Sequence, residues 1–223
     1  MNNRKQVLMV LTSHDRIDDE HPTGLWFEEF AVPYQRFRGH GYGVAVASIR
    51  GGAVPIDPRS MPEDPDAPGT RLSLDALDKT LALPGVELDA FDAVFFPGGH
   101  GTMYDLPGDP AVARLISTFA EQDKVVAAVC HGPAAFVAAT RSDGAPFLTG
   151  RRVAAFTNAE ERAVELDALM PFLLESRLRE LGAEVETGPD WSDHVVVDGR
   201  LVTGQNPQSS ASAAEAVIEL LGR

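Results

Sequence analysis

Short apolar runs alternate along the chain with segments of helical or turn character. The runs are rich in Val, Ala, Leu and Phe and contain no charged residue, which is typical of strands buried on both faces of a parallel sheet. A weaker segment at 183–186 predicts one more short strand, and Asp198-Gly199 predicts the turn of a hairpin over 195–203. The apolar runs predict buried strands at residues 7–11, 43–48, 93–96, 125–129 and 152–156.

Helical segments separate the predicted strands. Pro33 predicts a kink or break in the first helix, Ser73 is expected to cap the second at its N-terminus, and Gly182 ends the fifth. The proline- and glycine-rich residues 51–69 predict a surface loop. Strands that alternate with helices in this way indicate an α/β fold with a mostly parallel sheet, in a single domain over residues 1–223. The predicted helices are residues 24–37, 73–81, 111–121, 134–140, 171–181 and 210–221.

The net charge and the cysteine content limit which binding partners and which cellular compartment are expected for this protein. The 223 residues carry a formal net charge of −14, which argues against nucleic acid and anionic membranes as partners. The single cysteine excludes an intramolecular disulfide and fits a reducing compartment. Residues 1–6 lead straight into a predicted strand without a signal-peptide core, and no apolar stretch is long enough to span a bilayer. The expected location is the cytoplasm.

The single cysteine, Cys130, directly follows the predicted strand 125–129. His131-Gly132-Pro133 comes next and predicts the start of a helix. A thiol at a strand-to-helix turn, close to the positive end of a helix dipole, is expected to have a lowered pKa and to act as a nucleophile. The alternative is an inert buried cysteine, because free cysteines are among the most buried residues.

Two other loops leave the carboxyl ends of predicted strands, where parallel sheets gather ligands. Gly98-Gly99-His100-Gly101 follows the strand 93–96, and its amides could stabilise an oxyanion or simply form a tight turn. The segment 157–161 follows the strand 152–156, and a glutamate there could orient His131 or serve only as a helix N-terminal acid.

A glutamate pair lies in the first predicted helix. Glu28 and Glu29 follow the apolar residues Leu25, Trp26 and Phe27. A glutamate drawn in beside such a face would have a raised pKa and could hold a proton, whereas a solvated glutamate would do neither.

Five segments together resemble one protein family. The sequence is similar to the DJ-1/PfpI superfamily, and within it to the branch of heat-shock chaperones and glyoxalase III. The resemblance spans nearly the whole chain, and it implies a three-layer α/β/α sandwich with a flavodoxin-like sheet, like that of class I glutamine amidotransferases. The segments are Thr23 to Glu29, Pro97 to Thr102, Ala127 to Pro133, Phe156 to Glu161 and Asp198 to Pro207.

The resemblance also implies roles for individual residues. The family nucleophile falls on Cys130 and the triad histidine on His131. The triad acid falls on Glu161, with Glu160 as the alternative, and the acid beside the thiol falls on Glu29, with Glu28 as the alternative. The oxyanion and substrate-binding positions fall on Gly99, His100 and the amide of His131. The loop from Ala53 to Gly69 matches no family signature and could shape the mouth of the pocket.

These assignments imply a glutathione-independent glyoxalase, a glyoxalase III-type lyase that converts methylglyoxal or a similar α-oxoaldehyde to a 2-hydroxy acid. The alternatives are a stress-related holdase chaperone or protein deglycase, and a cysteine amidase or peptidase. No cofactor is expected, because the chemistry asks for none. No metal is expected either, since the sequence lacks a Cys/His cluster at zinc spacing. A homodimer is expected from the resemblance. Four histidines are predicted as loop or surface residues rather than ligands: His14, His21, His100 and His194.

Overall fold

A seven-stranded sheet forms the centre of the protein. The computed structural model describes residues 4–222, so the predicted domain limits at residues 1 and 223 lie outside the described residues. The strand order is β3-β2-β1-β4-β5-β9-β8, and every neighbouring pair is parallel except β8 and β9. The strands are β1 (Gln6–Leu11), β2 (Gly43–Ser48), β3 (Leu81–Ala82), β4 (Ala93–Phe96), β5 (Val125–Val129), β8 (Val195–Asp198) and β9 (Leu201–Gly204).

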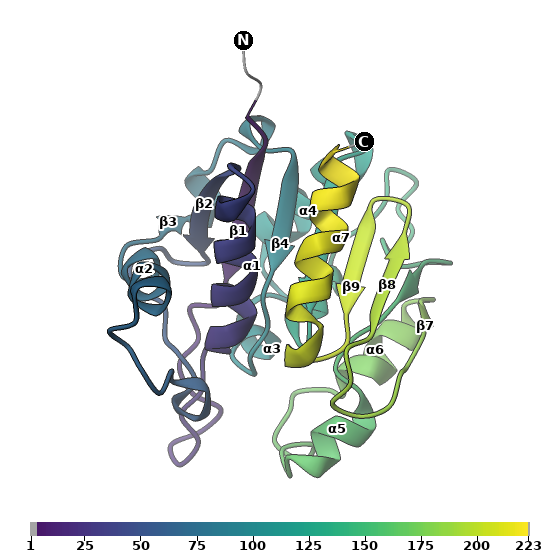
Figure 1. Ribbon diagram of the computed structural model, residues 1–223. Helices are drawn as coiled ribbons and strands as arrows, with labels where there is room; N and C mark the ends of the chain where they lie inside the picture. Colours follow the sequence, from purple (N-terminus) through teal and green to yellow (C-terminus); the bar gives the residue numbers. More distant parts are fainter. Residues whose placement is uncertain (1–3, 223) are drawn as a thin grey trace.

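Helices cover both faces of the sheet, so the predicted three-layer α/β/α sandwich is confirmed (Figure 1). One layer contains α1 (Phe27–Gly39), α2 (Pro68–Leu77) and α7 (Ser210–Gly222), with α1 packed against α7. The other contains α3 (Thr102–Asp105) and α4 (Pro110–Glu121). Without the short edge strand β3, the parallel strands follow the order β2-β1-β4-β5-β9, which is the flavodoxin-like arrangement.

The apolar runs are uninterrupted because each strand buries both of its faces. Along β1, Leu8 and Val10 pack into the core on one side of the sheet, and Val7, Met9 and Leu11 pack into the core on the other. All five side chains are fully buried. At about 1.5–3 kcal/mol for each buried large apolar side chain, this two-sided burial holds β1 at the centre of the sheet.

The first helix does not break where the sequence predicts a break. Helix α1 begins at Phe27 rather than residue 24 and continues through Pro33 to Gly39. A proline inside a helix costs about 3 kcal/mol. Burial of Phe30, Phe37 and the proline itself offsets that cost, because all three lie on the side of the helix that faces the core.

The predicted cap of the second helix is also wrong. Helix α2 begins at Pro68, so Ser73 lies inside it, buried, and its hydroxyl donates to the Gly69 carbonyl. The proline fits the first helical turn, where its missing N–H has no partner to lose. The loop predicted at 51–69 therefore ends earlier, and it contains one turn of 3₁₀ helix, Pro58–Ser60.

Three further elements differ from their predictions. The helix expected at 134–140 is a short 3₁₀ helix, Gly132–Phe136. The strand expected at 152–156 pairs only over β6 (Arg152–Val153), with β7 (Glu184–Val185), in a separate two-stranded sheet. The helix expected at 171–181 is shorter, α6 (Leu174–Glu180). An additional helix, α5 (Asn158–Ala163), begins at a capping box formed by Thr157 and Glu160.

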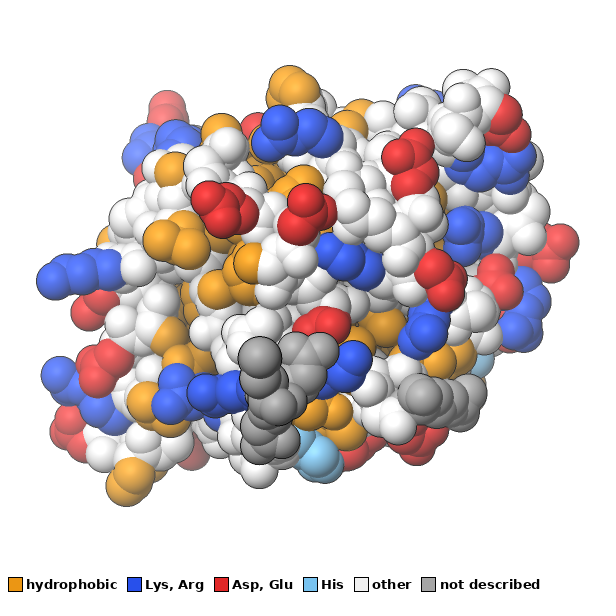
Figure 2. Space-filling model, turned by 90° about the horizontal axis from the view of Figure 1, so that it is seen from above, with side chains coloured by type: hydrophobic (Ala, Val, Ile, Leu, Met, Phe, Trp, Pro, Cys, Tyr) orange, Lys and Arg blue, Asp and Glu red, His pale blue; other side chains and the backbone are white. Residues whose placement is uncertain are grey.

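The end of the molecule seen from above Figure 1 carries intermixed acidic and basic side chains with small apolar areas between them (Figure 2). Within residues 4–222, no helix is both long and apolar enough to cross a membrane.

Candidate active site

Cys130 stands at a strained turn directly after β5. Its φ is 60°, a left-handed conformation that costs a non-glycine residue about 1–3 kcal/mol. The turn is fixed on both sides: the Cys130 N–H donates to the Gly204 carbonyl, and the Cys130 carbonyl accepts from the Phe156 N–H. The side chain is 4% exposed. The predicted strand-to-helix turn is therefore present, in the geometry that presents the nucleophile of α/β hydrolases.

His131 lies next to the sulfur. Its Nδ1 is 3.3 Å from the Cys130 Sγ, and its Nε2 is 2.7 Å from a carboxylate oxygen of Glu161. Gly132 makes this approach possible, because a Cβ at that position would lie 2.1 Å from the Phe96 carbonyl oxygen. The thiol, the imidazole and the carboxylate are thus aligned in the order that a catalytic triad requires.

The structure distinguishes Glu161 from Glu160. Glu161 points to the histidines, whereas both carboxylate oxygens of Glu160 accept hydrogen bonds from other groups. Those donors are the amide and hydroxyl of Thr157, the Trp191 amide and the side chains of Gln205 and Asn206. Glu160 therefore ties α5 to two neighbouring loops and holds Glu161 in place.

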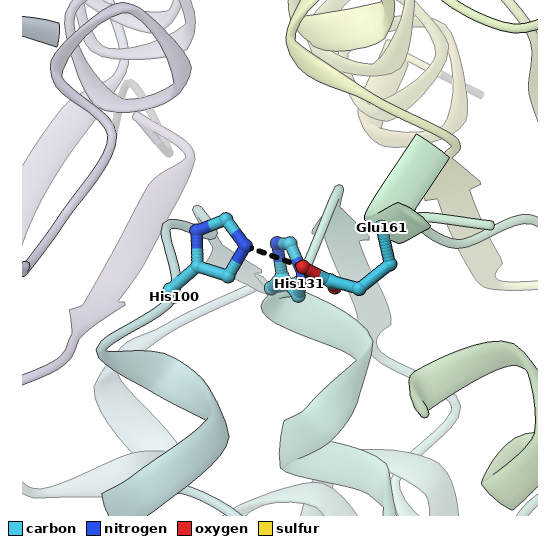
Figure 3. Close-up of side chains that lie close together, drawn as sticks. All are labelled: His100, His131 and Glu161. Carbon is cyan, nitrogen blue, oxygen red and sulfur yellow. Dashed lines mark hydrogen bonds and ion pairs between the residues drawn. The ribbon is translucent and has the colours of Figure 1, made fainter. Parts of the chain in front are cut away.

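A second imidazole binds the same carboxylate. His100 Nε2 lies 2.7 Å from Glu161 Oε1, so the two histidines, from the loops after β4 and β5, converge on a glutamate of α5 (Figure 3). His100 is 4% exposed, so the prediction that it is an ordinary loop or surface residue is wrong. Burial raises the pKa of Glu161, but the charge of His131 and hydrogen bonds from both imidazoles outweigh burial and lower it.

Glu29 approaches from α1. It is fully buried, and its Oε2 accepts the Gly98 N–H at 2.7 Å, whereas Glu28 is exposed. Among residues 4–222, Glu29 Oε1 has no hydrogen-bond partner of standard geometry, and the Cys130 side chain and Glu28 are the titratable groups that interact with this carboxyl. Burial raises the pKa of Glu29 to about 8, against the opposing effects of Cys130 and Gly98. Of the two glutamates, Glu29 is the buried one beside the thiol, and its role as a proton-holding acid stays a prediction.

The predicted low pKa of the thiol is wrong. Burial and the neighbouring Glu29 raise the pKa of Cys130 well above its usual value. The helix that was expected to stabilise a thiolate is only five residues of 3₁₀ helix, so its dipole is small. The raised pKa values of Cys130 and Glu29 both favour the protonated forms of the two groups. A role for His131 in removing the thiol proton stays a prediction.

Gly99 and His131 belong to the two loops, after β4 and β5, that carry the site histidines. Neither N–H has an acceptor among residues 4–222. Gly99 has a φ of 99°, and a Cβ there would lie 2.3 Å from the Gly24 carbonyl oxygen, so only glycine fits. An oxyanion-stabilising role for Gly99, His131 and the His100 backbone stays a prediction.

One group of side chains offers metal-ligand atoms. One ligand atom each from His100, His131 and Glu161 lies within 4.8 Å of the others. Two imidazoles and a carboxylate suit zinc, but both Nε2 atoms already bind the carboxylate at 2.7 Å. A metal held there would have to displace both bonds and dismantle the triad.

Two residues of the proline-rich loop also reach the site, and sequence analysis missed both. Arg59 Nη2 lies 3.2 Å from His100 Nδ1, and Arg59 makes three further bonds to Asp57. Asp57 is fully buried and also accepts from the Thr23 hydroxyl. The only sign of this pair in the sequence is an aspartate two residues before an arginine, and that is a weak signal.

The fold and the site define an α/β protein with a buried cysteine, paired with a histidine, at the carboxyl edge of a flavodoxin-like sheet. The chain belongs to the DJ-1/PfpI family, whose model matches residues 26–220.

Three relatives show how close the similarity is. The Saccharomyces cerevisiae protein named glutathione-independent glyoxalase HSP31 is 32% identical, over 97% of this chain and 98% of the relative. The structure of Francisella tularensis Rapid Encystment Protein 24 KDa is 33% identical with a TM-score of 0.92, over 97% and 99% of the two chains. The crystal structure of glyoxalase III from Candida albicans is 27% identical with a TM-score of 0.87, over 97% of both chains.

Proposed function

We propose that this protein is a glutathione-independent glyoxalase that converts methylglyoxal or a similar small α-oxoaldehyde to a 2-hydroxy acid. The observation that carries the proposal is the placement of one buried thiol between a proton acceptor, His131, and a protonated acid, Glu29. The full-length similarity to proteins named as glyoxalases supports the same conclusion.

The site residues can move every proton that the reaction needs. His131 takes the thiol proton as the Cys130 sulfur attacks the aldehyde carbon, and Glu29 gives its proton to the substrate oxygen, forming a hemithioacetal. The Glu29 carboxylate then removes the hydrogen from the former aldehyde carbon while the His131 imidazolium protonates the neighbouring carbonyl oxygen. Glu29 gives that hydrogen to the neighbouring carbon and takes the proton of the remaining hydroxyl, which leaves a thioester, a neutral His131 and a protonated Glu29. Neutral His131 takes a proton from water as the water attacks the thioester, and it returns that proton to the sulfur as the 2-hydroxy acid leaves.

The enclosure of the sulfur supports a small substrate. Cys130, His131 and Glu29 are between 0% and 4% exposed. A three-carbon aldehyde can reach such a thiol with little rearrangement, whereas an extended polypeptide segment cannot. A low-dielectric site also strengthens the charge interactions that an enediolate intermediate needs.

Lactate formation from methylglyoxal without glutathione tests the proposal. The wild-type protein is expected to form lactate, and Cys130→Ala is expected to lose activity to background, because the chain has no other cysteine. An exposed pair on α6 supplies a control, Glu180→Gln, which is expected to keep full activity. Lactate production by Cys130→Ala at the wild-type rate would overturn the thiol mechanism.

A cysteine amidase or peptidase is the second candidate. The distance of 3.3 Å between Cys130 Sγ and His131 Nδ1 supports it, because amide hydrolysis needs the same thiol and base. Hydrolysis of small fluorogenic amides, compared between the wild type and Glu29→Gln, separates the two activities. A hydrolase does not need proton transfer between substrate carbons, so its rate would survive the loss of Glu29.

The holdase chaperone and deglycase roles have less support. A holdase needs a contiguous exposed apolar patch, and the part of the chain that the structure describes has five exposed large apolar side chains, none adjacent to another in sequence. They are Met61, Leu72, Leu81, Trp191 and Val197. The homodimer and the cytoplasmic location stay predictions, and sedimentation analysis of the pure protein tests the first of them.

A further inference from the structure

The loop from Ala53 to Gly69 has no family signature, yet it is bonded firmly to the site. The Leu25 N–H donates to the Pro55 carbonyl, and the Asp57 N–H donates back to the Leu25 carbonyl. The Phe27 N–H, at the start of α1, donates to the Ser60 hydroxyl. The loop is therefore attached to the helix that carries Glu29.

This loop places Arg59 beside His100. Buried Asp57 holds its guanidinium through two bonds, Nε at 2.9 Å and Nη2 at 2.6 Å. The same Nη2 lies 3.2 Å from His100 Nδ1. The guanidinium also lies over the Trp26 ring, with 6.0 Å between its central carbon and the ring centroid. Asp57 and Trp26 thus fix one arginine beside the second imidazole.

The contact between Arg59 and His100 determines where the His100 proton lies. Arginine has only hydrogen-bond donors, so His100 Nδ1 must accept and carries no proton. The proton of the neutral ring is then on Nε2, where it donates to Glu161. The other tautomer would turn a bare nitrogen toward the carboxylate and would repel it.

This constraint reaches the sulfur through Glu161. One carboxylate oxygen accepts from His100, which leaves the other to accept from His131 Nε2. His131 therefore keeps its Nδ1 free of a proton and directed at Cys130, as a base must be. When Asp57, Arg59 and Glu161 are charged and both imidazoles are neutral, the contacts from Asp57 to the thiol allow only one placement of the two imidazole protons.

We propose, resting on the function above, that Arg59 is a positioning residue of the active site: held by Asp57, it fixes His100 as the neutral, Nε2-protonated tautomer and so keeps Glu161 bound to His131. Arg59 touches neither the sulfur nor the reacting carbons. Its effect on the thiol passes through two imidazoles and one carboxylate.

The charge state of His100 changes when Arg59 is removed. Burial lowers the pKa of His100 to about 4, helped by the charges of His131 and Arg59 and opposed by Glu161. Without the guanidinium, His100 Nδ1 can take a proton at a higher pH, because Glu161 faces the ring and Asp57 loses its partner. A cationic His100 weakens the hold of Glu161 on His131 and lowers the reactivity of the thiol.

The rate at which iodoacetamide alkylates Cys130 measures this loss of reactivity, and the measurement does not require glyoxalase activity. In Arg59→Gln, the alkylation rate relative to the wild type is expected to fall as the pH is lowered, because His100 then takes a proton that the guanidinium no longer opposes. Asp57→Asn/Arg59→Gln removes the buried unpaired carboxylate, so it keeps the test available if the single variant does not fold. Arg71→Ala, an exposed arginine of α2 paired with Asp66 and Asp75, is the matched control and should follow the wild type.

Chemical rescue sharpens the same test. Arg59 lines a cavity of about 170 Å³ together with Pro58, Ile17 and Leu166, so truncation opens a space that solvent can reach. Millimolar guanidinium is expected to restore most of the alkylation and lactate-forming rates to Arg59→Ala and to leave Arg71→Ala unchanged.

Nitrogen NMR of labelled histidine gives the direct readout. The wild type should show His100 with a bare Nδ1 and a protonated Nε2, and Arg59→Gln should lose that pattern. An unshifted alkylation profile together with an unchanged His100 signal in Arg59→Gln would overturn the proposal. If the wild type forms no lactate but these two readouts change, the proposed function fails and the positioning role stands.

Discussion

Two buried carboxylates flank the same sulfur, and their surroundings drive them to opposite charge states. Glu29 lies against apolar side chains with one backbone N–H as donor, and burial raises its pKa to about 8. Glu161 is as buried, but the charge of His131 and bonds from two imidazoles lower its pKa. The number and charge of donors, rather than burial, therefore decide which glutamate holds a proton.

The opposite charge states assign opposite tasks. A protonated Glu29 can donate to a substrate oxygen and then act as a base, while an ionised Glu161 can only orient and stabilise an imidazolium. Pairs of acids with pKa values pushed apart are a mark of acid–base catalysis. The comparison makes predictions that differ in sign for the two residues.

The substitution Glu161→Gln removes the carboxylate that orients His131. The glutamine amide offers one oxygen acceptor to the two imidazole N–H donors, so its NH₂ group faces one of those donors. His131 is then driven to the tautomer that carries its proton on Nδ1. The rate of lactate formation is expected to fall by about 10²–10⁴-fold. Steady-state kinetics measure the loss, and Glu161→Asp should recover part of it. Wild-type kcat in Glu161→Gln would show that Glu161 does not orient the base.

The pH dependence of the free energy of unfolding tests the same comparison, and the expected effect is smaller. The pKa of Glu29 is raised in the fold, from 4.5 to about 8, so the folded state binds more protons between those values. Stability from this group is fully present below about pH 4.5 and falls as pH rises toward 8. Between pH 4.5 and pH 7 the wild type should lose about 3 kcal/mol relative to Glu29→Gln.

Glu161 is expected to show the reverse trend. Its pKa is lowered in the fold, so its contribution is present above its unfolded pKa and is lost as pH falls. Urea unfolding of the wild type, Glu29→Gln and Glu161→Gln at pH values below and above 4.5 measures both trends, because the Glu161 contribution is lost only below that value. Parallel pH curves for the two variants would contradict the opposite charge states.

The sequence predicted the elements that local patterns control. The strand before Cys130 is a continuous apolar run, and the rule that parallel strands meet at their carboxyl ends correctly brought His100 and Cys130 to one edge. The segment before Glu161 also reaches that edge, but through the bond from the Phe156 N–H to the Cys130 carbonyl rather than as a strand of the main sheet. Family resemblance selected Glu29 and Glu161 from two glutamate pairs. Burial separates Glu29 from Glu28, whereas Glu160 and Glu161 are both buried and differ only in their hydrogen-bond partners.

Long-range packing controlled what the sequence could not predict. Pro33 lies inside a helix because buried aromatic residues hold it there, which no local rule reveals. Arg59 reaches His100 only because the loop bonds to Leu25 and Phe27, more than thirty residues earlier in the chain. The pKa of Cys130 was predicted in the wrong direction because a dipole was inferred from sequence while burial and Glu29 dominate.

The most direct test of the central claim is to trap the adduct between methylglyoxal and the single thiol. With Glu29→Gln, Cys130 can still attack the aldehyde, but no carboxylate is present to move the hydrogen between the substrate carbons. Rapid-quench intact-mass spectrometry should then show one methylglyoxal added at Cys130 of Glu29→Gln, with no adduct in Cys130→Ser/Glu29→Gln and lactate formed by the wild type alone. An unmodified Cys130 in Glu29→Gln, or lactate formed by that variant at the wild-type rate, would contradict the account.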